Sequence, residues 1–120
     1  MTNKSAFVNL VNDAKLRINE CSIECINNMT KNNTFDGILI DVRELSEYEA
    51  GCISNSIHIS RGILEAKIET LVPNKEQKIY LYCGGGYRSA LSADNLMKMG
   101  YKNTYSIAGG YRAWQMIKKL

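Results

Sequence analysis

The sequence is short of metal ligands and of long apolar runs, and each absence excludes a class of protein. Its 120 residues contain one histidine, His58, and no two cysteines in a C-x-x-C arrangement. Because protein zinc sites need several such ligands, no bound metal is expected. No apolar stretch approaches the length of a membrane-spanning helix, so no membrane partner is expected. Asn9 interrupts the apolar residues near the N-terminus, which is untypical of a secretory signal and indicates a cytoplasmic location.

An excess of charge of one sign is also absent. The net charge is +3, and the basic residues are spread along the chain, with Lys118-Lys119 as the only cluster. This dispersion argues against a nucleic-acid partner, whereas a small anionic substrate would suit the mild positive charge. A domain of this length can build a core without disulfides, so we expect reduced thiols at Cys21, Cys25, Cys52 and Cys83.

Apolar periodicity predicts that strands and helices alternate along the chain. Continuous apolar runs at 37–42 and 78–82 are typical of strands that are buried on both faces of a parallel sheet. Shorter strands are predicted at 18–21, 57–59 and 104–107. Helices are predicted at 4–17, at 22–29 after an N-cap at Ser22, at 44–50, at 60–69 with Ile63, Leu64 and Ile68 inward, at 89–99 and after Gly109-Gly110. The sequence therefore predicts one α/β domain with a mostly parallel central sheet of about five strands and helices on both faces.

The most informative segment is the loop that follows the strand at 78–82. It begins at Cys83, continues through three glycines to Arg88, and leads into a helix predicted to begin at Ser89. Glycines let several backbone N–H groups point at one centre, and a helix dipole adds to their effect, so the Cys83 thiol should ionise easily. Arg88 adds a permanent cation. The alternative is a small buried cysteine beside a merely flexible loop. We predict a nucleophilic Cys83 inside an anion-binding cradle made by Gly84, Gly85, Gly86, Tyr87, Arg88 and Ser89.

Four ordered segments between about Ile18 and Trp114 together resemble the rhodanese family of sulfurtransferases. Residues 40–44 are similar to a strand-end aspartate–arginine signature, 49–57 to an E-x-G-H-I segment, 82–89 to a C-x-x-G-x-R-S loop, and 108–114 to a terminal G-G-aromatic-x-x-W motif. The resemblance implies a single-domain rhodanese with a rhodanese-like fold. It assigns residues 1–17 to an N-terminal helical extension and residues 18–120 to the rhodanese domain.

The resemblance also implies a sulfurtransferase that works through a persulfide on Cys83. The thiolate would take the outer sulfur of a small anionic donor, such as thiosulfate, a polysulfide or a persulfide. It would then pass that sulfur to a thiol or to cyanide. A protein could serve as the donor or the acceptor. This chemistry needs no cofactor and no metal.

Three alternatives stay open at this point. The chain could be a sulfur carrier that depends on a protein partner, or a catalytically silent regulatory module, although the intact cysteine, glycines and arginine disfavour the silent form. It could also be a cysteine-based phosphatase or arsenate reductase, whose loops place the arginine six positions after the cysteine. Here Arg88 follows Cys83 by five positions, and Asp41 is the only strand-end candidate for the general acid.

The resemblance implies structural support from two charged residues at the end of the strand at 37–42. Asp41 is expected to accept hydrogen bonds from nearby loop N–H groups. Arg43 is expected to pair with a carboxylate such as Glu47 or Glu49, since charges near a buried strand end need partners.

Four further residues near these motifs receive predictions. Cys52 replaces the family's usual histidine and is expected to be a buried thiol, or alternatively a resolving thiol for a Cys83 persulfide. His58 is expected to have a structural role. Tyr87 is predicted to form a wall at the pocket mouth, and Arg61 either a second cation there or an exposed surface residue.

Overall fold

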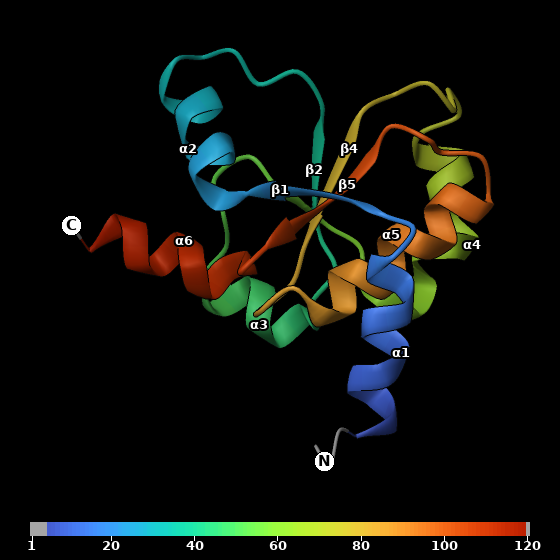
Figure 1. Ribbon diagram of the computed structural model, residues 1–120. Coiled ribbons are helices and arrows are strands. Elements are labelled where there is room, and N and C mark those ends of the chain that lie inside the picture. Colours follow the sequence, from blue (N-terminus) through green and yellow to red (C-terminus); the bar gives the residue numbers. More distant parts are fainter. Residues whose placement is uncertain (1–4, 120) are drawn as a thin grey trace.

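The computed structural model describes residues 5–119 and contains one fully parallel sheet with helices on both faces (Figure 1). The strand order is β1-β5-β4-β2-β3. The strands are β1 (Asn19–Ser22), β2 (Ile38–Asp41), β3 (Ile57–His58), β4 (Ile79–Tyr82) and β5 (Thr104–Ala108). The helices are α1 (Ala6–Lys15), α2 (Ile23–Lys31), α3 (Leu45–Ala50), α4 (Arg61–Leu71), α5 (Tyr87–Lys98) and α6 (Gly110–Lys118). The predicted α/β architecture with about five parallel strands is confirmed.

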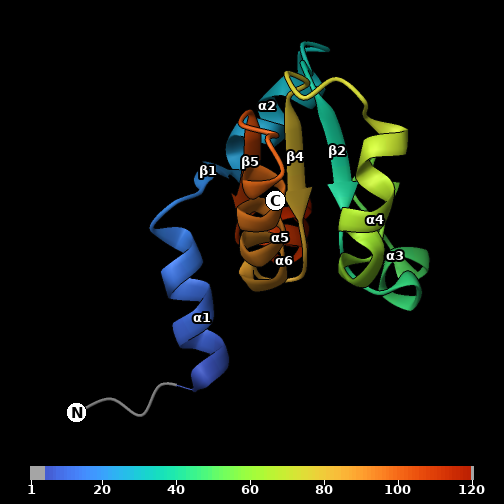
Figure 2. The same cartoon turned by 90° about the vertical axis from the view of Figure 1, so that its right-hand side faces the viewer.

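Two apolar clusters, one on each face of the sheet, form the core. On one face Leu64 and Ile68 of α4 and Leu96 of α5 pack against Ile40 and Leu81 of the sheet. On the other face side chains of α2 and α6 pack against Leu39, Tyr80, Tyr82 and Ile107. Figure 1 shows α2 and α6 on one side of β2, β4 and β5 and α4 and α5 on the other, and Figure 2 looks onto the side covered by α4 and α5. Central strand β4 is buried at every position because both of its faces are covered, as its apolar sequence predicts.

The carboxyl ends of the central strands bring together residues that are distant in sequence. Asp41 at the end of β2 is in register with Tyr82 at the end of β4, and Leu81 is in register with Ser106 of β5. Cys83 directly follows Tyr82. Parallel α/β sheets bind ligands beyond such carboxyl ends, so this edge is where a site is expected.

Two details of the helices differ from the sequence prediction. Helix α5 begins at Tyr87 rather than at Ser89, because Gly86 takes a φ of 102° at the N-cap and turns the chain into the helix two residues early. Ile63 of α4 is 45% exposed rather than inward, while Leu64 and Ile68 are fully buried. Helix α4 therefore buries fewer of its apolar side chains than the sequence predicts.

Helix α1 lies against the outer side of α5. Ser5 caps it by accepting a hydrogen bond from the Val8 N–H at 3.1 Å. Val11 and Ala14 are buried against Ala90 and Leu91 of α5. Phe7 and Leu10, two other apolar residues of α1, remain 44% and 55% exposed. Residue 4, the predicted first residue of this helix, lies outside the described residues.

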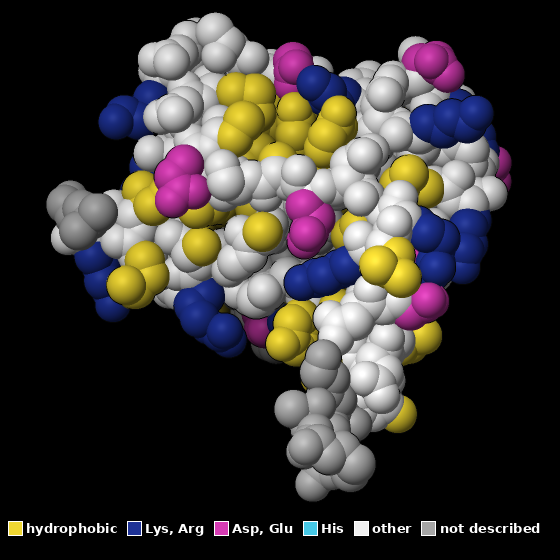
Figure 3. Space-filling view, viewed as in Figure 1, with side chains coloured by type: hydrophobic (Ala, Val, Ile, Leu, Met, Phe, Trp, Pro, Cys, Tyr) yellow, Lys and Arg dark blue, Asp and Glu magenta, His cyan; other side chains and the backbone are white. Residues whose placement is uncertain are grey.

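Two features would indicate other partners: a membrane-spanning helix in residues 5–119, and a basic stripe on the face that Figure 3 displays. Neither is present. Within residues 5–119, no helix has both the length and the apolar character needed to cross a bilayer. On the face shown in Figure 3, basic and acidic side chains alternate over the surface instead of gathering in one continuous band.

Candidate active site

Cys83 stands at the end of β4 with its sulfur enclosed by donors from the start of α5. The residue is 1% exposed. The Gly86 N–H donates to Sγ at 3.1 Å and the Ser89 N–H at 3.4 Å. The Ser89 hydroxyl lies 3.6 Å from Sγ and 2.8 Å from the Ser106 hydroxyl of β5. The sulfur therefore sits in a nest of N–H and O–H groups that can solvate an anion without water.

The hydrogen-bond donors around the sulfur lower the pKa of the Cys83 thiol. Burial raises the pKa of Cys83, since a charged sulfur is less stable away from water. Hydrogen bonds from Ser89, Gly86 and Gly85 stabilise the thiolate and outweigh burial, so the pKa of Cys83 lies below its ordinary value. A buried cysteine with a lowered pKa has the properties of a nucleophile rather than of a core residue.

The N-terminus of α6 fixes the loop from the other side. The Tyr111 N–H donates to the Cys83 carbonyl at 2.8 Å, and the Arg112 N–H donates to the Gly84 carbonyl at 3.0 Å. Gly110 allows this approach, since a Cβ there would collide with the Cys83 carbonyl oxygen. The second glycine of the terminal motif is thus needed for close contact with the loop.

Arg88 is not a free cation, contrary to the simplest reading of the loop. Its Nη1 donates to Glu47 Oε1 of α3 at 2.7 Å and its Nη2 to Oε2 at 3.2 Å. The Glu44 N–H at the start of α3 also donates to Glu47 Oε1, at 2.9 Å. Arg88 lowers the pKa of Glu47 to about 2, so this carboxylate stays charged and keeps the pair formed.

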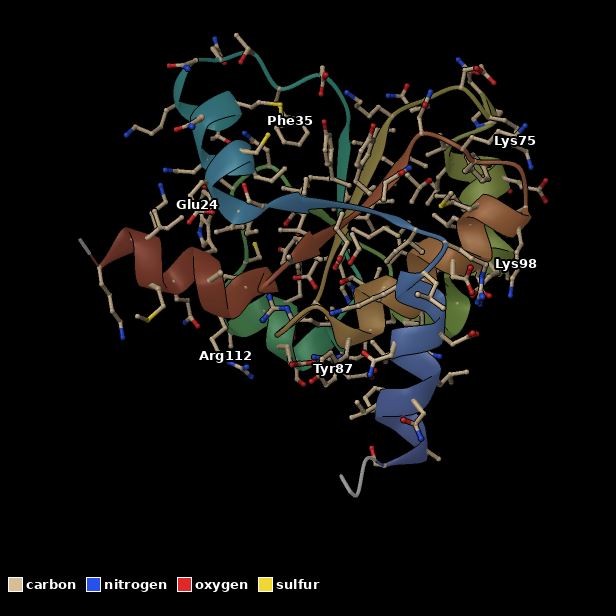
Figure 4. All side chains as sticks on the ribbon, in the orientation of Figure 1. Glu24, Phe35, Lys75, Tyr87, Lys98 and Arg112 are labelled. Carbon is tan, nitrogen blue, oxygen red and sulfur yellow. The ribbon has the colours of Figure 1, made fainter. Side chains whose placement is uncertain are left out.

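A cavity of about 430 Å³ opens beside Cys83. Tyr87 lines it, as predicted, whereas Arg61 does not. Three lining residues, Phe7, Glu47 and Arg112, were not predicted at this cavity, and Glu47 was named only as a possible partner of Arg43. Figure 4 shows Tyr87 and Arg112 at the same lower edge of the molecule, projecting from α5 and α6. The lining consists of Phe7, Glu47, Cys83, Gly84, Gly85, Tyr87, Arg88 and Arg112.

The missed residues reach the site through tertiary contacts. Phe7 comes from α1, packed with its ring centroid 5.9 Å from that of Tyr87. Glu47 could have been suspected from Arg88, since an arginine near a buried loop needs a partner. Arg112 carried one usable signal, because it follows the Gly109-Gly110 pair that lets α6 approach another backbone.

Asp41 and Arg43 form a buried pair beside the site. The Arg43 guanidinium donates to both Asp41 oxygens, with Nη2 to Oδ2 at 2.7 Å, and the Arg43 N–H donates to Oδ1 at 2.9 Å. The predicted pairing of Arg43 with Glu47 or Glu49 is therefore wrong, because Asp41 and the Gly51 carbonyl already use its donors. Asp41 does accept from a nearby loop N–H, as expected.

The other predicted residues lie outside the cavity lining. His58 Nε2 lies 2.8 Å from the Arg43 carbonyl and 3.2 Å from the Ser60 hydroxyl, so its ring is engaged in structural hydrogen bonds. Ser60 stands at the N-cap of α4, but its side chain makes no capping bond. Cys52 is half-buried and is not among the residues that line the Cys83 cavity.

A second cavity, of about 390 Å³, lies at the opposite edge of the sheet, near the start of β2. Its lining is uncharged and carries no cysteine. No group of three or more metal-ligating side chains occurs within residues 5–119. The Cys83 cavity is therefore the place in the described chain that combines a nucleophile, charge and access. The second cavity is lined by Met29, Thr30, Asn33, Phe35, Gly37, Ile38, Leu39, Ser54, Asn55 and Ile57.

Comparison with known families identifies the fold that carries this site. The rhodanese-like domain model matches residues 22–117, which include the whole Cys83 loop and the N-terminus of α6. This chain belongs to the rhodanese-like domain family. Helix α1, whose Phe7 lines the cavity, precedes the matched part of this rhodanese-like chain.

Two relatives show how the rhodanese-like domain is used elsewhere. The thiosulfate sulfurtransferase GlpE of Coxiella burnetii is 34% identical over 80 residues, which cover 67% of this chain and 73% of GlpE. A Bacillus subtilis protein named "Putative sulfur carrier protein YrkF" is 36% identical over 76 residues, which cover 63% of this chain. The matched part is 40% of YrkF, so this rhodanese-like chain spans less than half of that relative.

One solved structure matches nearly the whole rhodanese-like chain. It belongs to a Rhodopseudomonas palustris protein of unknown function that is described as a "Possible Tyrosine Phosphatase". The TM-score is 0.86 at 27% identity, and the match covers 98% of this chain and 95% of that one. Such coverage extends beyond the family match at 22–117, so the N-terminal part of the chain also has a structural counterpart there.

Proposed function

We propose that this protein is a sulfurtransferase in which Cys83 carries the transferred sulfur as a persulfide. The observation that carries the proposal is the Cys83 sulfur, held by N–H groups of Gly86 and Ser89 that lower its pKa. Such a cradle stabilises a sulfur anion at a site that opens into a cavity. The relatives named sulfurtransferase and sulfur carrier support the same chemistry.

The reaction proceeds in two displacements. The Cys83 thiolate attacks the outer sulfur of thiosulfate, the S–S bond of the donor breaks, and sulfite leaves with the electron pair. Cys83 then carries a terminal persulfide sulfur, whose negative charge lies beside the cradle donors. An acceptor thiolate or cyanide attacks that sulfur, and the Cys83 thiolate leaves. A polysulfide or a persulfide can replace thiosulfate in the first step, and no cofactor takes part.

The cavity disfavours a phosphatase. Among the described residues that line it, Glu47 is the only one with a carboxylate, and the pair with Arg88 lowers the pKa of Glu47 to about 2. A carboxylate held in this way does not protonate a leaving group near neutral pH. The Cys83 loop is also one residue shorter than the phosphatase pattern. The likeness to a "Possible Tyrosine Phosphatase" makes hydrolysis of an aryl phosphate a necessary control.

The deciding experiment is intact-mass analysis of the reduced protein after incubation with thiosulfate or polysulfide. We expect one added sulfur on wild type and none on Cys83→Ser. Cyanide should remove the sulfur as thiocyanate. Cys25→Ser is the matched control, since Cys25 is exposed and distant in sequence from the loop, and this variant should behave as wild type. Absence of added sulfur with every donor, together with aryl phosphate hydrolysis, would overturn the proposal.

A second measurement separates the enzyme from a carrier. An enzyme should complete many turnovers with thiosulfate and cyanide alone. A carrier should stop after the transfer of one sulfur until its protein partner is added.

We also propose that the protein acts in the cytoplasm, where thiols stay reduced and Cys83 remains available. Cell fractionation with the tagged chain tests this location.

A further inference from the structure

Two arginines line the Cys83 cavity, and within residues 5–119 only Arg88 is paired with a carboxylate. Arg88 is held by both carboxylate oxygens of Glu47. Arg112 is exposed at the start of α6 and forms no ion pair with any carboxylate within residues 5–119. Arg112 is therefore the cavity arginine whose charge no carboxylate within residues 5–119 balances.

The fold holds Arg112 over the loop. Its backbone N–H donates to the Gly84 carbonyl at 3.0 Å, which ties the base of the side chain to the loop. A Cβ added at Gly85 would lie 3.2 Å from Arg112 Nη1, so the guanidinium rests on the space that this glycine leaves. Arg112 and Tyr87 reach the same edge of the molecule from different helices (Figure 4). The guanidinium thus stands at the cavity, on the loop that bears the nucleophile.

We propose that Arg112 binds the anionic oxygens of the sulfur donor and thereby selects donors that carry a sulfonate-type group, as thiosulfate does. This inference rests on the proposed sulfurtransferase function and names the residue that recognises its substrate. A guanidinium is planar and offers parallel N–H donors, which match two oxygens of such a group. Arg112 acts on binding, while Cys83 carries out the chemistry.

Arg88 is less suited to this role. Arg88 keeps further N–H donors besides the two that bond to Glu47 at 2.7 and 3.2 Å, but the Glu47 carboxylate balances its charge and opposes an incoming anion. Arg112 has no carboxylate beside it within residues 5–119, so its charge is available to an anion. On this proposal Arg88 fixes the loop against α3, and Arg112 meets the ligand.

The test uses two alkylating reagents that differ in charge and not in reaction. Iodoacetate is an anion and iodoacetamide is neutral, and both alkylate the Cys83 thiolate. Arg112→Gln should lower the ratio of the iodoacetate rate to the iodoacetamide rate by about fivefold, the size expected for one partly exposed charge pair. Arg61→Gln removes the same charge away from the cavity and should leave the ratio within about twofold. An unchanged ratio in Arg112→Gln would overturn the proposal.

Donor kinetics complete the test. Arg112→Gln should raise the KM for thiosulfate by about tenfold with little change in kcat, and Arg112→Lys should recover part of the loss. Inorganic polysulfide, which has no sulfonate oxygens, should be affected by less than about twofold. An equal loss with both donors would overturn the proposal. If wild type takes sulfur from no donor, the proposed function fails, yet the alkylation ratio still decides whether Arg112 attracts anions.

Discussion

At the scale of single residues, the reactivity of Cys83 depends on a balance between burial and hydrogen bonding. Burial alone would leave a neutral, unreactive thiol. The Ser89 side chain lies between Cys83 and Ser106, so its hydroxyl can donate to the sulfur when the thiol ionises. The thiolate therefore depends on the first turn of α5, and changes there should alter the pH dependence of reaction.

The first prediction concerns this hydroxyl. Alkylation of wild-type Cys83 by iodoacetamide should rise with pH, with a midpoint below the pH of about 8.5 at which a free cysteine ionises. Ser89→Ala removes one donor to the thiolate, so the midpoint should move to higher pH and the rate at neutral pH should fall by about threefold or more. Ser92→Ala is the control, because Ser92 bonds to the Arg88 carbonyl instead of the sulfur. A midpoint unmoved by Ser89→Ala contradicts the prediction.

The second prediction concerns the buried pair at the end of β2. Asp41 is fully buried and Arg43 is 5% exposed, and the arginine also lies 4.3 Å from the Tyr111 ring centroid. Arg43→Met leaves the Asp41 carboxylate without its partner and should lower the free energy of unfolding by about 3–5 kcal/mol. Urea denaturation measures this loss. The double variant with Asp41→Asn should be more stable than Arg43→Met alone, and a less stable double variant would argue against an uncompensated charge.

At the scale of elements, α1 is attached to the rest of the molecule mainly through α5. Val11 and Ala14 are buried against α5, and just beyond the helix Arg17 donates to Asp94 from Nε at 3.0 Å and from Nη2 at 2.9 Å. In the described part of the chain, residues 5–119, the sheet begins at Asn19 and includes nothing before it. We therefore propose that residues 1–17 form an extension that can open while the rhodanese-like domain at 18–120 stays folded.

The third prediction follows from this attachment. Asp94→Asn removes the charge that Arg17 binds, so the amides of α1 should exchange hydrogen at least about threefold faster. Amides of β4 should keep their protection, since that strand is buried in the centre of the sheet. Hydrogen exchange followed by mass spectrometry resolves the two segments. Equal acceleration in α1 and β4 would show that α1 and the sheet open together.

At the scale of elements, the structure also shows which features could be predicted from the sequence. Strands β2 and β4 were predictable because a strand buried on both faces must be apolar throughout. The Cys83 loop was predictable because its glycines, cysteine and arginine are neighbours in the chain. The early start of α5 was not, since it depends on the positive φ of Gly86. Arg112 and Glu47 were not predicted at the cavity because tertiary packing carries them there, and the sequence offers only indirect signals for it.

At the scale of the whole molecule, ion pairs link elements that are distant in sequence. Arg88 and Glu47 join α5 to α3, while Arg17 and Asp94 join the residues after α1 to α5. Arg88 lowers the pKa of Glu47 to about 2, and Arg17 holds the pKa of Asp94 below its ordinary value. These carboxylates consequently link the stability of the fold to acid.

The fourth prediction is the shape of that dependence. Because both carboxyl groups have lower pKa values in the folded state, the unfolded chain binds more protons in acid. Their contribution to stability should be fully present above pH about 4.5 and lost as the pH falls toward about 2. Urea denaturation across this range measures it, and Glu47→Gln should flatten the curve. A wild-type curve no steeper than that of Glu47→Gln would show that the Glu47 pair contributes no such linkage.

The depth of Cys83 has a consequence for how the molecule changes between its two chemical states. In the empty form the reactive atom is the thiol sulfur, in a residue that is 1% exposed. In the proposed loaded form it is the added sulfur, which lies about 2 Å farther along, one S–S bond from Sγ toward the cavity. In the resting protein, bulky reagents cannot contact the buried Cys83 sulfur. In the persulfide form, the added sulfur extends into the cavity, where it can react with an acceptor that is too large to enter.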